Sequence, residues 1–166
     1  MLDSLDLVVR GLVMGVVGSA LMDVWSAALR RFGIPTLDYR LLGRWIGHFP
    51  NGQLVHERIA SSRPVRGELA LGWVAHYAIG VTFAFLLLAI WGRPWLQSPT
   101  IVPAIVVGLG TIVAPWFILQ PAMGAGFAGS KSPNPTATRA RSLGTHLVYG
   151  LGLYVSALVM SVLADL

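Results

Sequence analysis

The sequence predicts an all-α integral membrane protein, a bundle of four transmembrane helices, and two observations carry this prediction. Of the 166 residues, 55% are hydrophobic and only 11% are charged, whereas a soluble domain averages about 25% charged residues. The apolar residues also fall in four continuous runs, each long enough to cross a hydrocarbon core as a helix. Continuous runs favour helices over the alternating strands of a membrane barrel.

Each predicted span is bounded by charged or turn-forming residues. The connection from Gly92 to Thr100 is a short turn marked by two prolines, and Pro115 and Pro121 predict kinks in the third span. No second domain or internal repeat is evident, so residues 1–166 form a single membrane domain. The predicted spans are 7–29, 67–91, 101–123 and 143–164.

The distribution of positive charge predicts the orientation of the bundle. Ten of the twelve Lys and Arg residues lie in the two longer connections, 30–66 and 124–142, and only Arg10 and Arg93 lie on the opposite side. The positive-inside rule therefore places the long loops in the cytoplasm and both termini across the membrane. The basic charge is a topology signal, and no nucleic-acid partner is expected. The absence of cysteine excludes disulfides, thiolate metal sites and cysteine nucleophiles.

The first cytoplasmic loop contains a stretch that mixes apolar and basic residues. The segment "YRLLGRWIGHF" interleaves leucine, tryptophan, isoleucine and phenylalanine with two arginines. This pattern predicts a short amphipathic helix that lies at the membrane interface.

Small residues recur at intervals of four along the spans, which predicts close helix packing in lipid. The ionisable residues Asp23 and His76 lie on these ridges and therefore face protein. The ridges are Gly11, Gly15, Ser19, Asp23 and Ala27 in the first span, Gly72, His76, Gly80 and Ala84 in the second, Ala104 and Gly108 in the third, and His146, Gly150, Ala157 and Ser161 in the fourth.

Four polar side chains lie in the cytoplasmic half of the membrane. At 1.5 Å per residue, Asp23 lies about 9 Å from the cytoplasmic end of its span, His76 about 13 Å, and Gln120 and His146 about 5 Å. An ionised Asp at this depth costs several kcal/mol unless it is paired, and its expected partner is His76 or His146. The residues form either a functional site or a structural ion pair between helices.

Imidazoles and carboxylates together also suit a transition metal, and a haem b is a narrower alternative. The loops add His48, His56, Glu57 and Glu68 on the same side of the membrane. A haem between His76 and His146 would use room beside two glycines, although the two histidines differ in depth by about 8 Å. The metal set would be Asp23, His76 and His146 with His48 or His56, and the haem would use Gly72, Gly80, Arg66 and Arg141.

The second loop begins with the glycine-rich stretch "GAGFAGSKSPNP". Its backbone is a candidate nest for an anionic lipid head group near Lys131, Arg139 and Arg141, and the alternative is a flexible connector. No Walker motif, dinucleotide fingerprint or Ser-His-Asp order is present.

Five stretches resemble a family of small bacterial inner-membrane proteins described only as a domain of unknown function. They are "LMDVW", "GRWIGHFPNGQLVHERI", "PVRGELALGWVAHYAIG", "APWFILQPAMGAGFAGSKSPNP" and "RSLGTHLVYGLGLY". The resemblance covers nearly the whole chain. It implies four spans in a bacterial inner membrane, and it implies no activity or catalytic residue. In such a membrane the orientation predicted from the charge distribution places both termini in the periplasm.

Three functional hypotheses follow. The first is a non-enzymatic carrier, subunit or assembly partner with a polar Asp/His pocket, working as a homo-oligomer or with a membrane-protein partner, since four short helices enclose little volume. The second is a metal- or haem-binding oxidoreductase that acts on a lipophilic substrate. The third is a purely structural bundle whose polar groups pair internally.

Overall fold

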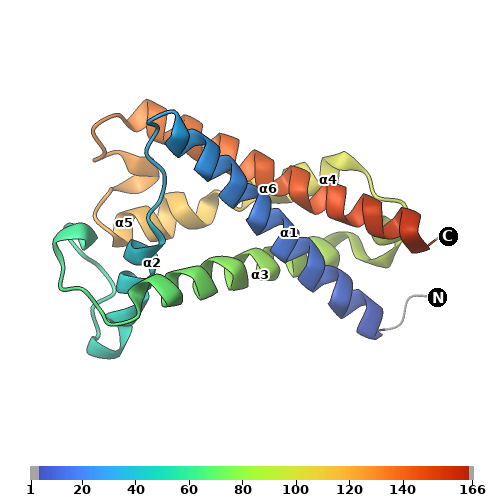
Figure 1. Cartoon of the computed structure of the whole chain (residues 1–166), viewed down its shortest axis with the longest axis horizontal. Coiled ribbons are helices and arrows are strands. Elements are labelled where there is room, and N and C mark those ends of the chain that lie inside the picture. The colour runs from blue at the N-terminus through green and yellow to red at the C-terminus, as the bar shows by residue number, and fades with distance from the viewer. Residues whose placement is uncertain (1–3, 165–166) are drawn as a thin grey trace.

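The structure, a computed structural model, describes residues 4–164, and every regular element in that range is helical. Four helices are long and apolar enough to cross a membrane, and they run along the long axis of the molecule (Figure 1). The predicted all-α, four-helix fold is therefore confirmed for the described residues. The spans are α1 (Ser4–Arg31), α3 (Glu68–Gln97), the composite helix Ile101–Ala122 and α6 (Pro135–Ala164).

The third span is interrupted near its middle. Helix α4 (Ile101–Gly110) ends in a turn, a π-helical segment follows (Pro115–Leu119), and α5 (Gln120–Ala122) completes the span. Proline at position 115 has no N–H to continue the α-helical bonding. The predicted irregularity at Pro115 is thus present, whereas Pro121 lies within α5.

The end of α3 differs from the prediction. The sequence places a turn from Gly92 to Thr100, but the helix bends at Gly92 and continues to Gln97. Gly92 adopts φ 66°, ψ −166°, a conformation that glycine tolerates, and helical geometry then resumes beyond it. Trp95 in this last segment is buried and its indole N–H donates to the Thr100 carbonyl at 3.0 Å, which closes the short turn to α4.

Glycine and serine set the distances between the helices, as the small-residue ridges predict. A Cβ added at Gly15 would collide with the backbone of Val81, and one at Gly80 would collide with the Ser19 hydroxyl, so α1 and α3 meet closely. Helix α6 is held in the same way, by Gly152 against α1 and by Gly150 against α4. Around these crossings lies an apolar core that includes the fully buried Met14, Leu87, Leu96, Tyr149 and Leu153.

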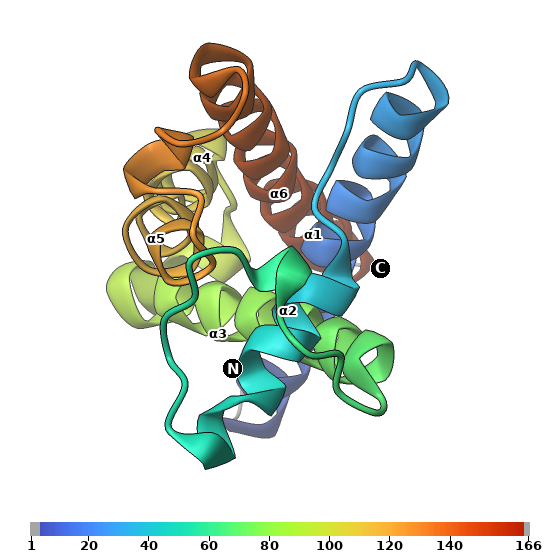
Figure 2. The same cartoon turned by 90° about the vertical axis from the view of Figure 1, so that its left-hand side faces the viewer.

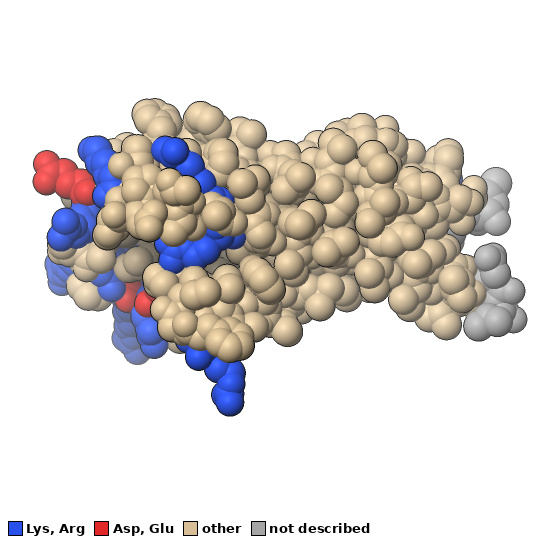
Figure 3. Space-filling model, turned by 90° about the horizontal axis from the view of Figure 1, so that it is seen from above, with Lys and Arg blue, Asp and Glu red and all other residues tan. Residues whose placement is uncertain are grey.

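Both long connections lie at one end of the bundle, opposite the turn between α3 and α4 (Figures 1 and 2). Lys and Arg side chains gather at the same end, while the rest of the face in Figure 3 carries none. This end also contains α2 (Tyr39–Gly47) and three 3-10 turns, Phe49–Asn51, Ile59–Ser61 and Phe127–Gly129.

Helix α2 is the short helix expected in the first loop. Asp38 caps it by accepting a hydrogen bond from the Arg40 backbone N–H at 2.9 Å. The buried face of α2 packs against the first turns of α3, where the backbones meet at Gly43 and Gly72. The helix therefore covers the end of a membrane span.

Candidate functional site

Asp23 lies at the centre of a polar cluster where α1, α2 and α3 meet. The Tyr39 hydroxyl from α2 donates to Asp23 Oδ1 at 2.7 Å, and the Tyr77 hydroxyl from α3 donates to Oδ2 at 2.9 Å. Both carboxylate oxygens therefore accept a hydrogen bond, which is the arrangement of an ionised carboxylate.

His76 completes the cluster from α3. Its Nε2 lies 3.2 Å from Asp23 Oδ1 and 3.2 Å from the Tyr39 hydroxyl oxygen. Tyr39 gives its only proton to Asp23, so a proton carried by His76 Nε2 faces the same two oxygens, and the His76 ring also contacts the Ser19 backbone. The side chains of Asp23 and His76 are 18% and 11% exposed, so most of the pair is shielded. We name Asp23, Tyr39, His76 and Tyr77 the Asp23 cluster.

Aromatic rings pack around this carboxylate. Tyr39 stacks on His76 with ring centroids 4.4 Å apart and meets Trp73 edge-on at 4.5 Å. Trp73 and Tyr77 lie nearly parallel, with centroids 6.2 Å apart. The carboxylate is thus bordered by ring systems contributed by two different helices.

Two glycines explain how α2 places Tyr39 beside the spans. A Cβ at Gly43 would overlap the Glu68 carbonyl, and one at Gly72 would overlap the Tyr39 carbonyl. Only glycine at both positions lets the two backbones approach this closely. Burial, followed by the hydrogen bond to Asp23, raises the pKa of Tyr39 above its ordinary value, so the hydroxyl remains a donor.

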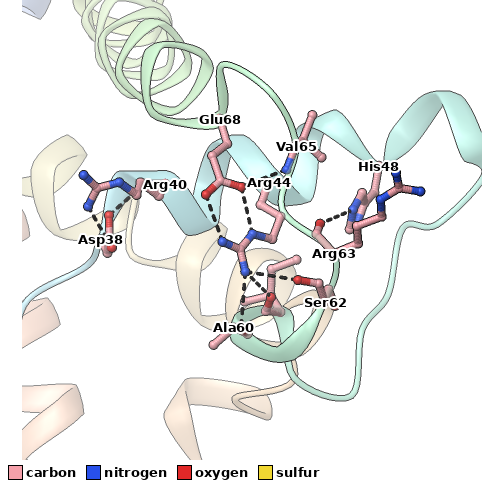
Figure 4. Close-up of polar contacts among 10 residues, drawn as sticks. Asp38, Arg40, Arg44, His48, Ala60, Ser62, Arg63, Val65 and Glu68 are labelled. Atoms are coloured by element: carbon pink, nitrogen blue, oxygen red, sulfur yellow. Dashed lines mark hydrogen bonds and ion pairs between the residues drawn. The ribbon is translucent and has the colours of Figure 1, made fainter.

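A second set of contacts fixes α2 at its middle (Figure 4). The Arg44 guanidinium binds both carboxylate oxygens of Glu68, with Nε–Oε2 at 2.9 Å and Nη2–Oε1 at 2.8 Å. Its Nη1 donates to the backbone carbonyls of Ile59, Ala60 and Ser62 at 3.1–3.3 Å. The hydrogen bond to Glu68 is the main reason that the pKa of Arg44 is raised. Arg44 therefore ties α2, the following loop and the start of α3 together.

The two loop histidines pair with each other, away from the Asp23 cluster. His48 Nδ1 lies 2.7 Å from His56 Nε2, and His48 Nε2 donates to the Arg63 carbonyl at 3.0 Å. Both side chains are buried, and His56 Nδ1 has no hydrogen-bond partner.

The remaining predicted site residues lie elsewhere in the fold. His146 Nδ1 is 2.8 Å from the Thr111 hydroxyl, so His146 joins α6 to the third span instead of meeting Asp23. Gln120 has a buried side-chain oxygen without a partner, near Gly129. The Glu57 side chain is exposed.

The predicted metal and haem ligands are not gathered at one point. Within residues 4–164, no three His, Asp or Glu side chains come together in a way that suits a metal ion. The space beside Gly72 and Gly80, considered for a porphyrin, is filled by Tyr39 and Ser19. These residues therefore do not fit a haem between His76 and His146.

The basic residues of the second loop mostly bind backbone. Arg139 donates to the Ala128 carbonyl at 3.0 Å, and Arg141 donates to the Pro35 and Ala137 carbonyls at 2.8 and 3.1 Å. Lys131 is exposed. Arg141 thus links α6 to the segment that leads from α1 to α2.

Residues 12–160 match the model of a family described as "Protein of unknown function (DUF2938)". The chain belongs to this family. The match agrees with the resemblance carried by the five sequence stretches and covers nearly the whole chain. No curated protein and no solved structure matches the chain.

In this family member, sequence reasoning identified Asp23 and His76 but missed three of their neighbours. Tyr39, Tyr77 and Trp73 were not singled out, although Tyr77 directly follows His76 and Tyr39 opens the amphipathic segment. Together the side chains of the Asp23 cluster form a site that holds one negative charge when His76 is neutral. Such a site has the chemistry to bind a proton.

Proposed function

We propose that this chain is a small, non-enzymatic, proton-coupled membrane carrier, in which Asp23 and His76 form the proton-binding site. The observation that supports the proposal is the contact between the Asp23 carboxylate and His76 Nε2, at 3.2 Å, within two helices long enough to span a membrane. Ionisable groups at such depth are costly and typically mark ion or proton pathways.

Protonation of this pair changes the forces between helices. With neutral His76 the cluster has one net negative charge, and one added proton neutralises it. The same carboxylate accepts hydrogen bonds from a hydroxyl of α2 and a hydroxyl of α3. Its charge therefore affects how strongly both helices bind to α1. A change of charge that alters helix contacts is what a proton-coupled carrier requires.

The proposal also includes a location and an assembly. We infer a bacterial inner (plasma) membrane, with the arginine-rich loops in the cytoplasm and the termini in the periplasm, from the positive-inside rule and the family resemblance. Four helices enclose little volume, so we infer that the carrier works as a homo-oligomer or with a membrane-protein partner.

The proton-binding step can be measured by infrared spectroscopy on the purified protein in detergent. As the pH falls from about 9 to about 5, a range that includes the ordinary titration of histidine, we expect the absorption bands of the Asp23 cluster side chains to change as one proton is taken up. The Asp23→Asn variant should lack this change. Tyr154→Phe, which removes a hydroxyl from α6, should retain it.

The carrier step can be measured in liposomes that contain a trapped pH dye. An imposed potential should acidify wild-type vesicles faster than protein-free vesicles, and Asp23→Asn should reduce the rate to the protein-free value. Equal rates for wild-type and protein-free vesicles would contradict the carrier role. Identical infrared titrations of wild type and Asp23→Asn would contradict the proton-binding site.

A further inference from the structure

The surroundings of Asp23 also indicate what else binds there. The ring systems of Tyr39, Trp73, His76 and Tyr77 lie next to one another, with centroid separations from 4.4 to 6.2 Å, and the two tyrosine hydroxyls point at the carboxylate. Aromatic faces attract cations, and rings grouped around a site are a known means of recognising quaternary ammonium groups. A carboxylate beside such rings adds a full negative charge.

The charged groups around the cluster leave this negative charge uncompensated when His76 is neutral. On α2, Arg44 is neutralised by its bidentate pairing with Glu68 of α3. On α1, Arg30 acts on Tyr39 at longer range, but it is exposed and donates to the Thr36 hydroxyl at 2.7 Å. The groups in direct contact with Asp23 are Tyr39, Tyr77 and His76. A monovalent cation therefore has a favourable electrostatic site here.

The chemistry of the lining distinguishes an organic cation from a metal ion. Hard divalent cations need several oxygen ligands, and transition metals need several imidazole, thiolate or carboxylate ligands. The described part of the chain offers no group of three such side chains. Rings with one carboxylate suit a bulky cation of low charge density.

The cluster is reached from the apolar surface of the bundle. Trp73 is 38% exposed and the adjacent Val74 is 68% exposed, both on a helix long and apolar enough to span a membrane. A cation with apolar substituents partitions into the hydrocarbon layer of a membrane, and on this helix the Trp73 ring is exposed to that layer. The Tyr39 side chain comes from a separate helix, α2, and forms another wall of the cluster, in edge-on contact with the Trp73 ring.

We propose that the substrate is a lipophilic organic cation, which replaces one proton at the Asp23 cluster. This inference rests on the proposed carrier function. The exchange is balanced: the cation binds to the ionised carboxylate and the rings, and the proton that neutralised the cluster leaves to water. Because proton and cation neutralise the same charge, they exclude each other.

Tetraphenylphosphonium is a suitable probe, and its binding to the whole protein in detergent can be measured by equilibrium dialysis. We expect saturable binding that weakens by about tenfold for each unit of pH below the proton-binding pKa, because one proton competes with one cation. Below this pKa, where the cluster is protonated before the cation binds, weakly buffered solutions should show release of about one proton per cation bound.

Three variants test the assignment of residues. Asp23→Asn should abolish binding, whereas Tyr154→Phe should leave it unchanged. Trp73→Leu keeps an apolar side chain at this position but removes the ring, and the loss of a cation–π contact should weaken binding about 5- to 30-fold. The proton competition in the wild type needs no variant, so the test does not depend on whether Asp23→Asn folds.

The outcomes separate this inference from the carrier proposal. If the infrared titration detects proton uptake at Asp23 but tetraphenylphosphonium does not bind, the substrate assignment is wrong and the proton-binding site stands. Equal binding by wild type and Asp23→Asn, with no pH dependence, would reveal partition into the detergent micelle and would also overturn the assignment. If the wild-type protein shows neither proton uptake nor tetraphenylphosphonium binding, both proposals are overturned.

Discussion

Tyr39 is the residue through which the loop helix contacts the carboxylate between the spans. Its hydroxyl donates to Asp23 at 2.7 Å and also lies 3.2 Å from His76 Nε2. A hydrogen bond to a charged group contributes about 1.5–3 kcal/mol. Tyr39→Phe should therefore lower the free energy of unfolding by about that amount, and Tyr154→Phe should have a smaller effect. Thermal unfolding in detergent measures both.

The pH dependence of this contribution has a definite sign. The pKa of Tyr39 is raised in the folded protein, so its stabilising effect is complete below the ordinary tyrosine pKa of about 10. It is lost only as the pH rises through the higher folded-state value. The stability difference between wild type and Tyr39→Phe should thus stay constant from about pH 8 to about pH 10. A decline of the difference within this range would contradict the structure.

Arg44 provides a second prediction at the level of single residues. Its side chain is 11% exposed and that of Glu68 is 14% exposed, so removing one partner leaves a nearly buried charge. Such a loss typically costs about 3–5 kcal/mol. Arg44→Met should be destabilising to that extent, and the double variant Arg44→Met, Glu68→Gln should recover part of the loss. Denaturation of the four proteins in this cycle measures the coupling, and additive effects would contradict the ion pair.

At the level of residues, the sequence indicates the direction of a side chain where the periodicity of one helix determines it. Asp23 and His76 lie on ridges of small residues, so the periodicity of each helix was enough to turn them toward protein. The partners Tyr39 and Arg44 lie on a separate helix, and no spacing along the chain specifies which part of α3 they meet. The Arg44–Glu68 pair was missed because Arg44 was interpreted as a basic residue of the amphipathic segment and Glu68 as a contributor to the polar site.

At the level of elements, the junction of α2 with α3 depends on two glycines. A methyl group at Gly43 would overlap the Glu68 carbonyl, so Gly43→Ala should push α2 away and destabilise the protein by about 1–3 kcal/mol. Gly110→Ala is the matched control, because nothing lies within 4 Å of an added Cβ there. Gly43→Ala should also weaken the Tyr39–Asp23 hydrogen bond, which would raise the hydrogen-exchange rate of α2. Equal stability of the two variants would contradict the close contact.

Element boundaries were predictable except where glycine or proline changed the helix without ending it. The second span was predicted to end at Trp91, before a turn that contains Pro94, yet the helix bends at Gly92 and α3 continues to Gln97. At Pro115 the expected kink takes the form of a π-helical segment, and the span continues through it. In both places the glycine or proline indicates that the helix is disturbed. Whether the helix continues depends on how the next segment packs, which is Trp95 in the first place and α5 in the second.

At the scale of the whole molecule, apolar length and charge placement were sufficient to predict four spans with the basic loops at one end (Figure 3). Both properties depend on many residues, so errors at single positions do not alter them. The location of the polar groups was less accurate. Asp23 pairs with His76, whereas His146 contacts Thr111 between α6 and the third span.

Orientation in the membrane gives the last prediction, and the lack of cysteine makes it simple to test. Single cysteines can replace the exposed Ser61, Ser98 and Ser130 in otherwise unaltered chains. Because both basic loops lie at one end, Ser61→Cys and Ser130→Cys should react with a membrane-impermeant thiol reagent from the same side, and Ser98→Cys from the other. The excess of Arg and Lys further predicts that the shared side is the cytoplasm, so in intact cells only Ser98→Cys should be labelled. Labelling of Ser61→Cys and Ser98→Cys from one side would rule out the four-span arrangement, and labelling of both loop cysteines in intact cells would reverse the orientation and place the Asp23 cluster near the outer face.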